Sequence, residues 1–186
     1  MTTATVLDRK LDRTYDMFLA MIPNSSGLRE EHFEATAQRL AQGNPDTTRE
    51  QLSRLVAANH AFWDEYLKPM DANGDGVIDR NEFRTGFDKA LERDRDGFIG
   101  AFSNSIMAWM DIIDTDRSNT VERDEFVSMY QRTFGAPVEK LNEAFDKLDL
   151  NGDGSLDTEE LKQAVLEYWT SDDPSAPGNW LFGSID

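Results

Sequence analysis

The chain has 186 residues, and its 36 acidic against 19 basic side chains give a formal net charge of −17 at pH 7. This charge argues against nucleic acid and anionic membrane surfaces as partners, since both would repel it. The absence of cysteine excludes disulfides, thiolate metal sites and cysteine nucleophiles, and two histidines leave little room for a Ser-His-Asp triad.

The N-terminal residues 1–8 contain neither the basic segment nor the apolar run of a signal peptide. Thr2 stands where a myristoylation signal needs glycine. No uncharged apolar run approaches the roughly 18 residues of a membrane-spanning helix. Hydrophobic residues still make up 39% of the chain, which is enough for a folded core. We therefore expect a soluble, cytoplasmic protein that does not bind membranes.

Residues 15–40 (unit I) predict two amphipathic helices around a short loop. Residues at helical spacing mark the two helices: Tyr15, Phe18, Leu19 and Ile22 in the first, and Phe33, Thr36, Ala37 and Leu40 in the second. The loop between them, residues 23–32 (loop I), offers no inward set of carboxylates. Glu30 and Glu31 fit better as first-turn acids of the second helix.

Residues 63–87 (unit II) repeat the pattern around an acidic loop of twelve residues, 71–82 (loop II). The apolar residues at helical spacing before the loop (its apolar stripe) are Trp63, Tyr66, Leu67 and Met70. After the loop, Phe83 and Phe87 follow at helical spacing. Oxygen-bearing side chains occupy positions 1, 3, 5, 9 and 12, with Gly76 at position 6 and Ile78 at position 8. We expect Pro69 to kink the end of the preceding helix.

Residues 92–100 contain two glycines and alternating charges. Asp94 and Asp96 resemble the start of another acidic loop, but Ser105 stands where its closing glutamate would be. We interpret the two acids as part of a charged turn. The segment is expected to bend, so that the two halves of the chain pack together.

Residues 106–130 (unit III) and 141–165 (unit IV) have the same two stripes around loops at 114–125 (loop III) and 149–160 (loop IV). Position 8 is again a branched aliphatic residue, Val121 or Leu156. Gly154 takes position 6 of loop IV, where a positive φ is needed. Asn119 takes it in loop III, and asparagine is among the few other residues that tolerate this conformation.

The loop pattern is that of a site for a hard cation. Calcium prefers six to eight oxygen ligands at roughly 2.3–2.6 Å, and side chains at alternate positions of a curled loop converge on one point. Position 7 supplies a carbonyl, position 9 often acts through water, and a glutamate at position 12 can supply both oxygens. This is the EF-hand signature. Asn-Gly at 73–74 and 151–152 could also begin hairpins, but the flanking helical stripes leave no strands to pair.

The whole chain resembles the sarcoplasmic calcium-binding proteins and their bacterial relative calerythrin. The likeness rests on the four units and on the tail Ser171-Asp172-Asp173-Pro174-Ser175-Ala176-Pro177-Gly178-Asn179-Trp180-Leu181-Phe182-Gly183. It implies an all-α protein of four EF-hand units in two pairs, with short antiparallel β-bridges between paired loops. We expect an N-terminal pair at residues 1–95, a C-terminal pair at 96–170 and a tail at 171–186 that packs back on the core.

The paired loops define which short strands should meet. Leu28 is expected to pair with Ile78, and Val121 with Leu156. Loop I is expected to bind nothing, because Ile22 and Phe33 are 11 residues apart, whereas the matching residues around the other loops are 13 apart.

The resemblance transfers metal ligands only to loops whose chemistry matches. In loop II they are Asp71, Asn73, Asp75, Val77 through its carbonyl, Asp79 and Glu82. In loop III they are Asp114, Asp116, Ser118, Thr120 through its carbonyl, Glu122 and Glu125. In loop IV they are Asp149, Asn151, Asp153, Ser155 through its carbonyl, Asp157 and Glu160. We expect loop III to be the weakest site, since Ser118 is neutral and Arg117 and Arg123 lie nearby.

The resemblance further implies an intracellular calcium buffer with three active sites, for which magnesium competes. Seven methionines do not indicate the Met-rich groove of a target-binding sensor. A calcium sensor that regulates a target protein through an exposed hydrophobic groove is the alternative. We expect no enzyme activity, because no nucleophile–base set or phosphate loop is present, and we expect a monomer without an obligate protein partner.

Overall fold

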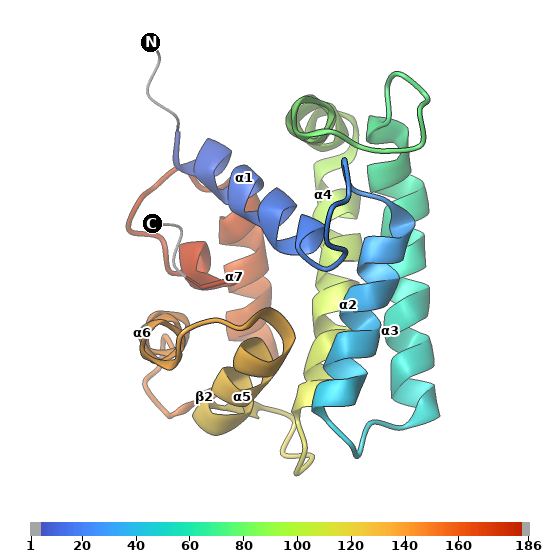
Figure 1. The fold of residues 1–186 in the computed structure, drawn as a ribbon. Coiled ribbons are helices and arrows are strands. Elements are labelled where there is room, and N and C mark those ends of the chain that lie inside the picture. Colours follow the sequence, from blue (N-terminus) through green and yellow to red (C-terminus); the bar gives the residue numbers. More distant parts are fainter. Residues whose placement is uncertain (1–4, 184–186) are drawn as a thin grey trace.

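The computed structural model describes residues 5–183, and seven α-helices account for most of them (Figure 1). Two short strands and three irregular helical turns complete the secondary structure. The elements in chain order are α1 Val6–Leu19, α2 Glu30–Gly43, α3 Arg49–Phe62, a π-helical segment Trp63–Leu67, a 3₁₀ turn Lys68–Met70, α4 Arg80–Ile113, β1 Val121–Glu122, α5 Arg123–Phe134, α6 Val138–Leu148, β2 Ser155–Leu156, α7 Thr158–Thr170 and a 3₁₀ turn Pro177–Trp180. The predicted all-α class is confirmed.

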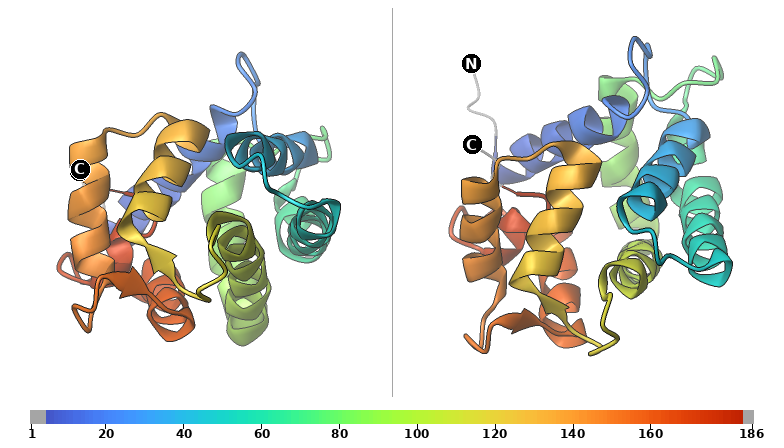
Figure 2. Two further views of the ribbon diagram at one scale, coloured as in Figure 1. Left: turned by 90° about the horizontal axis from the view of Figure 1, so that it is seen from below. Right: turned by 60° about the horizontal axis from the view of Figure 1, so that its bottom comes forward.

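The long helix α4 lies between two groups of helices, with α2 and α3 on one side and α5, α6 and α7 on the other (Figures 1 and 2). The helix α1 crosses from α7 toward α2, and α2 packs on both α3 and α5. The two halves of the chain therefore share one body rather than standing apart on a single extended helix.

The loops meet in two pairs at the predicted residues. Val121 pairs with Leu156 in an antiparallel two-stranded sheet, and Leu28 pairs with Ile78 through an antiparallel bridge. In the bridge, the N–H of each residue donates to the carbonyl of the other at 2.9 Å. All four side chains are buried, so these contacts join each loop pair to the core.

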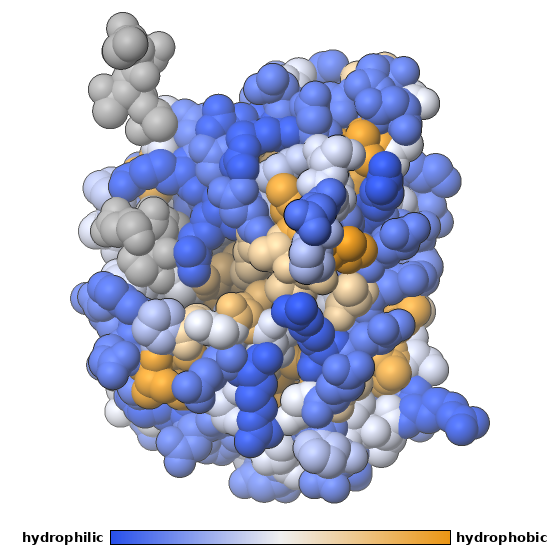
Figure 3. Space-filling model, viewed as in Figure 1, coloured by the Kyte–Doolittle hydropathy of each residue, from blue (hydrophilic) through white to orange (hydrophobic). Residues whose placement is uncertain are grey.

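A continuous set of buried apolar side chains spans both halves. At its centre, the rings of Phe87, Phe98 and Phe102 on α4 surround Trp169 of α7, with centroids 4.9–5.5 Å from the indole. In the face drawn in Figure 3, polar residues cover most of the surface, and apolar residues show in a hollow between α1 and α5 and in small separate spots elsewhere. Burial of aromatic area on this scale is the dominant stabilising contribution expected for such a fold.

The end of the helix before loop II differs from the expected regular helix. The stripe residues Trp63, Tyr66 and Leu67 lie in the π-helical segment, and Met70 ends the 3₁₀ turn. Pro69 explains part of this, because the carbonyl of Glu65 would pair in an α-helix with an N–H that proline lacks. The guanidinium of Arg93 donates to that carbonyl instead, at 2.9 Å.

The linker predicted as a charged turn is helical. Residues 92–100 lie within α4, and the predicted bend is present as a kink at Asp94, whose φ is −160° and ψ is 78°. The Asp94 carboxylate accepts the N–H of Gly97 at 3.0 Å, which caps the second part of the helix, and the hydroxyl of Tyr66 at 3.1 Å. Capping allows helix to resume directly after the bend, so no turn is needed.

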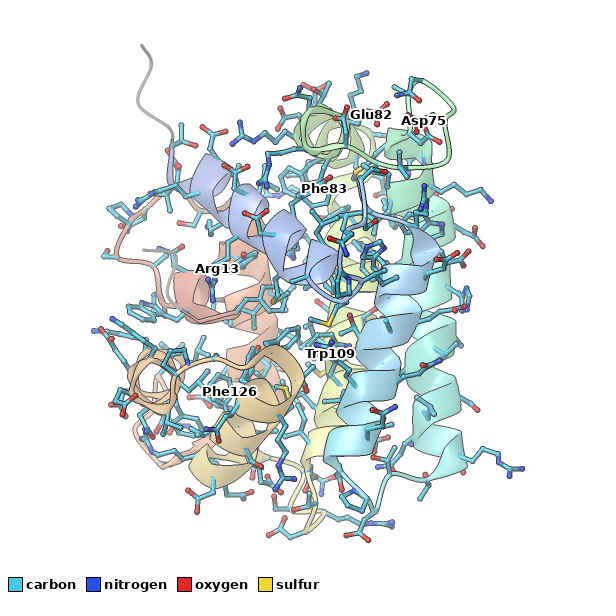
Figure 4. All side chains as sticks on the ribbon, in the orientation of Figure 1. Arg13, Asp75, Glu82, Phe83, Trp109 and Phe126 are labelled. Carbon is cyan, nitrogen blue, oxygen red and sulfur yellow. The ribbon has the colours of Figure 1, made fainter. Side chains whose placement is uncertain are left out.

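The C-terminal residues up to 183 lie against the core. Leu181 and Phe182 are 1% and 2% exposed, and the Phe182 ring lies 5.1 Å from that of Tyr168. Arg13 of α1 donates to the Phe182 carbonyl at 2.8 and 3.1 Å (Figure 4). None of the helices within residues 5–183 is both long and apolar enough to cross a membrane.

Candidate metal centres

Loops II and IV are curled by the same hydrogen bonds. The first aspartate of each loop accepts backbone N–H groups from positions 4, 5 and 6: Asp71 from Gly74, Asp75 and Gly76 at 2.8–3.2 Å, and Asp149 from Gly152, Asp153 and Gly154 at 2.8–3.2 Å. The asparagine at position 3 accepts from position 5 at 2.8 Å in both loops. These bonds bring the side-chain oxygens of positions 1, 3 and 5 to the inside of one turn.

The glutamate at position 12 folds back across each of these loops. Glu82 accepts the N–H groups of Ala72 and Asn73 through Oε1, at 3.1 and 3.2 Å, and that of Asp79 through Oε2 at 3.0 Å. Glu160 repeats the arrangement on Leu150, Asn151 and Asp157 at 2.9–3.2 Å. Figure 4 shows Asp75 and Glu82 together at the end of the molecule that carries loop II. The carboxylate thus lies beside the start of the loop, where both its oxygens can reach an ion.

The backbone of the three loops has the left-handed residues that the sequence predicts, and one more in each. Position 6 has a φ of 83° at Gly76, 64° at Asn119 and 89° at Gly154. Position 4 is also left-handed, with a φ of 73° at Gly74, 63° at Arg117 and 72° at Gly152. Arginine is strained in this conformation whereas glycine is not, so loop III contains a strained residue that the other two lack.

Loop III closes around its own set of oxygens. Carboxylate oxygens of Asp114, Asp116 and Glu125 all lie within 4.8 Å of one another. Asp114 accepts the N–H groups of Ser118 and Asn119 at 3.0 and 2.9 Å. Carboxylates this close repel one another unless a cation lies between them, which is the electrostatic basis of a divalent-ion site.

The closing glutamate of loop III has three hydrogen bonds, as its counterparts have, but one of them comes from a side-chain hydroxyl. Glu125 accepts both the N–H and the hydroxyl of Thr115, at 2.6 and 2.7 Å. Burial raises the pKa of Glu125, whereas hydrogen bonding with the Glu125 side chain lowers the pKa of Glu122. The two carboxylates therefore share one local environment.

The residue at position 9 has a second task in loops II and IV. Asp79 accepts the N–H groups of Asn81 and Glu82, both at 2.8 Å, and Asp157 accepts those of Glu159 and Glu160 at 2.8 and 2.9 Å. Each aspartate is therefore the N-cap of the helix that follows. In this orientation it is placed to reach an ion through water, as position 9 often does.

Loop I ends in a histidine where the other three end in glutamate. His32 is the third residue of α2, and Glu82, Glu125 and Glu160 hold the same place in α4, α5 and α7. Its Nδ1 accepts the N–H of Arg29 at 3.1 Å, and the side chain is 1% exposed. An imidazole keeps the helix cap but removes the two oxygens that calcium needs. This replacement supports the expectation that loop I binds no ion.

Sequence reasoning brought together the residues of each loop but missed several supporting groups. It gave no role to Thr115, which fixes Glu125, or to Arg29, which donates to the Gly76 carbonyl of loop II at 3.4 Å. The alignment of His32 with the closing glutamates is a more direct reason to expect that loop I binds no ion. The Arg29 contact connects elements 47 residues apart, so no local pattern signals it.

Comparison with known proteins identifies the helix–loop–helix units. The EF-hand family model matches residues 64–87 and 141–166, and the model of an EF-hand domain pair matches residues 104–133. These segments contain loops II, IV and III. The chain is 26% identical over 171 residues to the sarcoplasmic calcium-binding protein alpha chain of Penaeus vannamei, covering 88% of this chain and 89% of that protein.

Two bacterial proteins are also similar. Calerythrin of Saccharopolyspora erythraea is 25% identical over 170 residues, covering 90% of this chain and 94% of its own length. A solved structure of a Streptomyces coelicolor calcium-binding protein superposes with a TM-score of 0.72 at 24% identity, over 88% of this chain and 98% of that one. This last likeness concerns the fold.

Proposed function

We propose that this EF-hand protein, which is related to the sarcoplasmic calcium-binding proteins, is a cytoplasmic calcium and magnesium buffer with three ion sites, in loops II, III and IV. The observation that carries the proposal is the folded-back glutamate at position 12. Glu82, Glu125 and Glu160 each lie across their loop within hydrogen-bond distance of its second residue. A carboxylate held there needs only a small movement to give both oxygens to an ion.

The residues proposed as ligands are the eighteen that the sequence predicts at positions 1, 3, 5, 7, 9 and 12. Each loop contributes four carboxylates. Three divalent ions would bring the formal charge from −17 to −11. Relief of this repulsion would make the loaded form more stable than the free form, because an ion that binds only the folded state stabilises it by mass action.

A buffer is favoured over a sensor by the way apolar surface is covered. A sensor opens on calcium and presents a hydrophobic groove to its target. Here Leu181 and Phe182 of the tail already pack on Tyr130, Tyr168 and Trp109 of the core. Among the described residues, only Leu150 and Leu166 are large apolar side chains more than a third exposed, at 53% and 39%. The proposal therefore assigns the tail as a permanent part of the core, not a removable cover.

Magnesium is the expected competitor. It demands octahedral geometry at roughly 2.0–2.1 Å and keeps several waters. A closing glutamate that turns from two oxygens to one would meet this demand, and the open, exposed loops give water access. The protein as proposed is a monomer, catalyses no reaction and requires no obligate partner.

The test is a comparison of apolar surface and ion competition on the full chain. A dye that fluoresces on exposed apolar surface should show little change when calcium is added, and magnesium should weaken apparent calcium affinity at all three loops. A large calcium-dependent rise in dye fluorescence would instead favour the sensor, which the related Streptomyces coelicolor protein, described in terms of calcium-mediated regulation, makes the second candidate.

A further inference from the structure

A pocket of about 240 Å³ lies where α2, the end of α4 and α5 meet. Its apolar lining comes from Leu40, Ile112, Ile113 and Met129. A wider depression of about 450 Å³ adjoins it and shares Gly43 and Arg132 with it. An apolar pocket therefore lies beside a more polar depression, and the two together are called the cavity below.

The mouth of this cavity carries two arginines in a strongly acidic protein. Arg39 and Arg132 both line the outer depression. Neither has a carboxylate within ion-pair distance among residues 5–183, so both guanidinium groups are available to an anion. Arg132 is held in place by donating to the Gly43 carbonyl at 2.6 Å, which uses one of its five N–H donors.

A buried hydroxyl in the pocket wall also lacks a partner. Thr133 lines the pocket and is 2% exposed, and its Oγ1 makes no hydrogen bond within the described part of the chain. A buried hydroxyl without a partner costs free energy, so such groups usually have a ligand or water to bind. Arg132 lines the same pocket as Thr133.

We propose that this cavity binds a small amphipathic carboxylate, of the fatty-acid type with about eight carbons. The carboxylate would lie between Arg39 and Arg132, where bidentate hydrogen bonds to guanidinium are strongest, and the chain would lie on Leu40, Ile112 and Met129. A volume of 240 Å³ equals roughly eight waters at about 30 Å³ each, which is room for such a chain.

The charges on the cavity wall fix the orientation of this ligand. Asp124 and Glu125 also line the pocket, but they precede Arg132 on α5 by two turns, or roughly 11 Å at 1.5 Å per residue. An anionic head is therefore repelled from that end and attracted to the arginines. Glu125, the closing glutamate of loop III, is part of this lining, so the test removes calcium and magnesium in order to hold the loop in one state.

The test is titration of octanoate into the full chain with calcium and magnesium removed by a chelator. We expect saturable binding of one octanoate, with amide shifts in nuclear magnetic resonance spectra centred on Gly43 and Thr133. Arg39→Gln and Arg132→Gln should each weaken binding roughly tenfold, the effect of losing one charged hydrogen bond. Arg95→Gln is the matched control, because Arg95 is exposed on α4, outside the cavity lining, and makes no ion pair within the described residues; it should bind like the wild type.

Two further probes distinguish the contribution of the ligand's carboxylate from that of its hydrocarbon chain. Acetate lacks the chain and octan-1-ol lacks the charge, so both should bind much more weakly than octanoate. The proposal is overturned if octanoate shows no saturable binding below its micellar concentration, or if both Arg39→Gln and Arg132→Gln bind it as the wild type does. Association with phosphatidylcholine vesicles carrying octanoate, without binding of the free acid, would equally overturn it in favour of a membrane surface.

Discussion

At the scale of single residues, two differences between loop III and its counterparts are expected to weaken its ion binding. Arg117 takes a left-handed conformation that Gly74 and Gly152 take without strain. Ser118 replaces an aspartate at position 5, and its hydroxyl donates to Glu122 at 3.0 Å. An ion would have to compete with that internal bond, so we expect this loop to have the lowest affinity.

This ranking predicts the effect of replacing each closing glutamate. A site whose dissociation constant lies a hundredfold below the free calcium concentration stabilises the fold by about 2.7 kcal/mol. Glu82→Gln and Glu160→Gln should each remove up to about that amount of the calcium-induced increase in the free energy of unfolding, and Glu125→Gln should remove less. Urea unfolding at fixed calcium measures all three. Glu125→Gln as the most damaging change would refute the ranking.

Lys10 is a buried amine whose surroundings predict a change of stability at alkaline pH. Its side chain is fully buried and donates to the carbonyls of Glu167 and Ser171 at 3.0 and 2.6 Å, at the C-terminal end of α7. Burial lowers the pKa of Lys10 from 10.5 to about 8, although Asp172 and Glu167 oppose the shift. The cost of burying the charge is thus reduced only in part by the helix end.

The lowered pKa predicts that stability rises with pH in one window. Between about pH 8 and 10.5 the unfolded chain holds a proton on Lys10 that the folded chain has lost, so the free energy of unfolding increases with pH there. In Lys10→Met this contribution should be absent. Urea unfolding of both proteins at several values between pH 7 and 10 measures the difference. If the free energy of unfolding changed with pH in the same way in both proteins, Lys10 would have its ordinary pKa in the folded state.

At the scale of elements, most helices could be predicted from the sequence, and the exceptions have physical causes. The stripes located the helices on both sides of each loop, because a half-buried helix must repeat its apolar residues every three or four positions. The same rule could not show that residues 63–70 form π and 3₁₀ turns. That change depends on Pro69 and on Arg93, which lies 28 residues from its acceptor Glu65.

Arg93 is predicted to compensate for the missing N–H of Pro69. Arg93→Ala removes the donor to the Glu65 carbonyl and a cation–π contact 5.4 Å from the centroid of Tyr66. We expect a loss of about 1–2 kcal/mol in the free energy of unfolding. Urea unfolding measures it, with Arg95→Ala as the control for charge.

A double-mutant cycle distinguishes this compensation from a general effect of charge. In a Pro69→Ala background the new N–H at position 69 can bond the Glu65 carbonyl, so Arg93→Ala should cost less than in the wild type. Equal costs in both backgrounds would show that Arg93 does not replace the missing bond.

The positions of the acidic residues in each loop could also be predicted from the sequence, whereas the hydrogen bonds that hold them could not. Spacing of acids in twelve residues identifies positions 1 to 12, because the loop is a local structure of fixed length. The three-dimensional fold of each loop decides which N–H groups hold the closing glutamates Glu82, Glu125 and Glu160 in place. The expectation that loop I binds no ion rests on its short length, and His32 in the place of a closing glutamate supports it.

At the scale of the whole molecule, the tail and the N-terminal helix close the core together. Tyr130 donates to the Leu181 carbonyl, Arg13 donates to that of Phe182, and the Thr14 hydroxyl lies 2.7 Å from that of Tyr168. These contacts join residues 51 to 169 positions apart. They make residues 171–183 part of the folded body and leave little apolar surface for a target.

Truncation of the Phe182 ring tests that assignment. Phe182→Ala should lower the free energy of unfolding by about 3–5 kcal/mol, the usual cost of removing a buried aromatic side chain. It should also increase binding of a dye for apolar surface. Leu166→Ala is the control, because Leu166 is 39% exposed and should change stability little. A loss no larger than that of the control would show that the tail is not part of the core.

The most direct test of the whole account is the number of calcium ions bound per chain. Calorimetric titration of the full protein at physiological salt should give three ions, and removal of any one of the three closing glutamates should give two at calcium levels that saturate the remaining loops. His32→Ala should leave the number at three, because loop I supplies no carboxylate set. A wild-type protein that binds one ion or none would contradict the central claim.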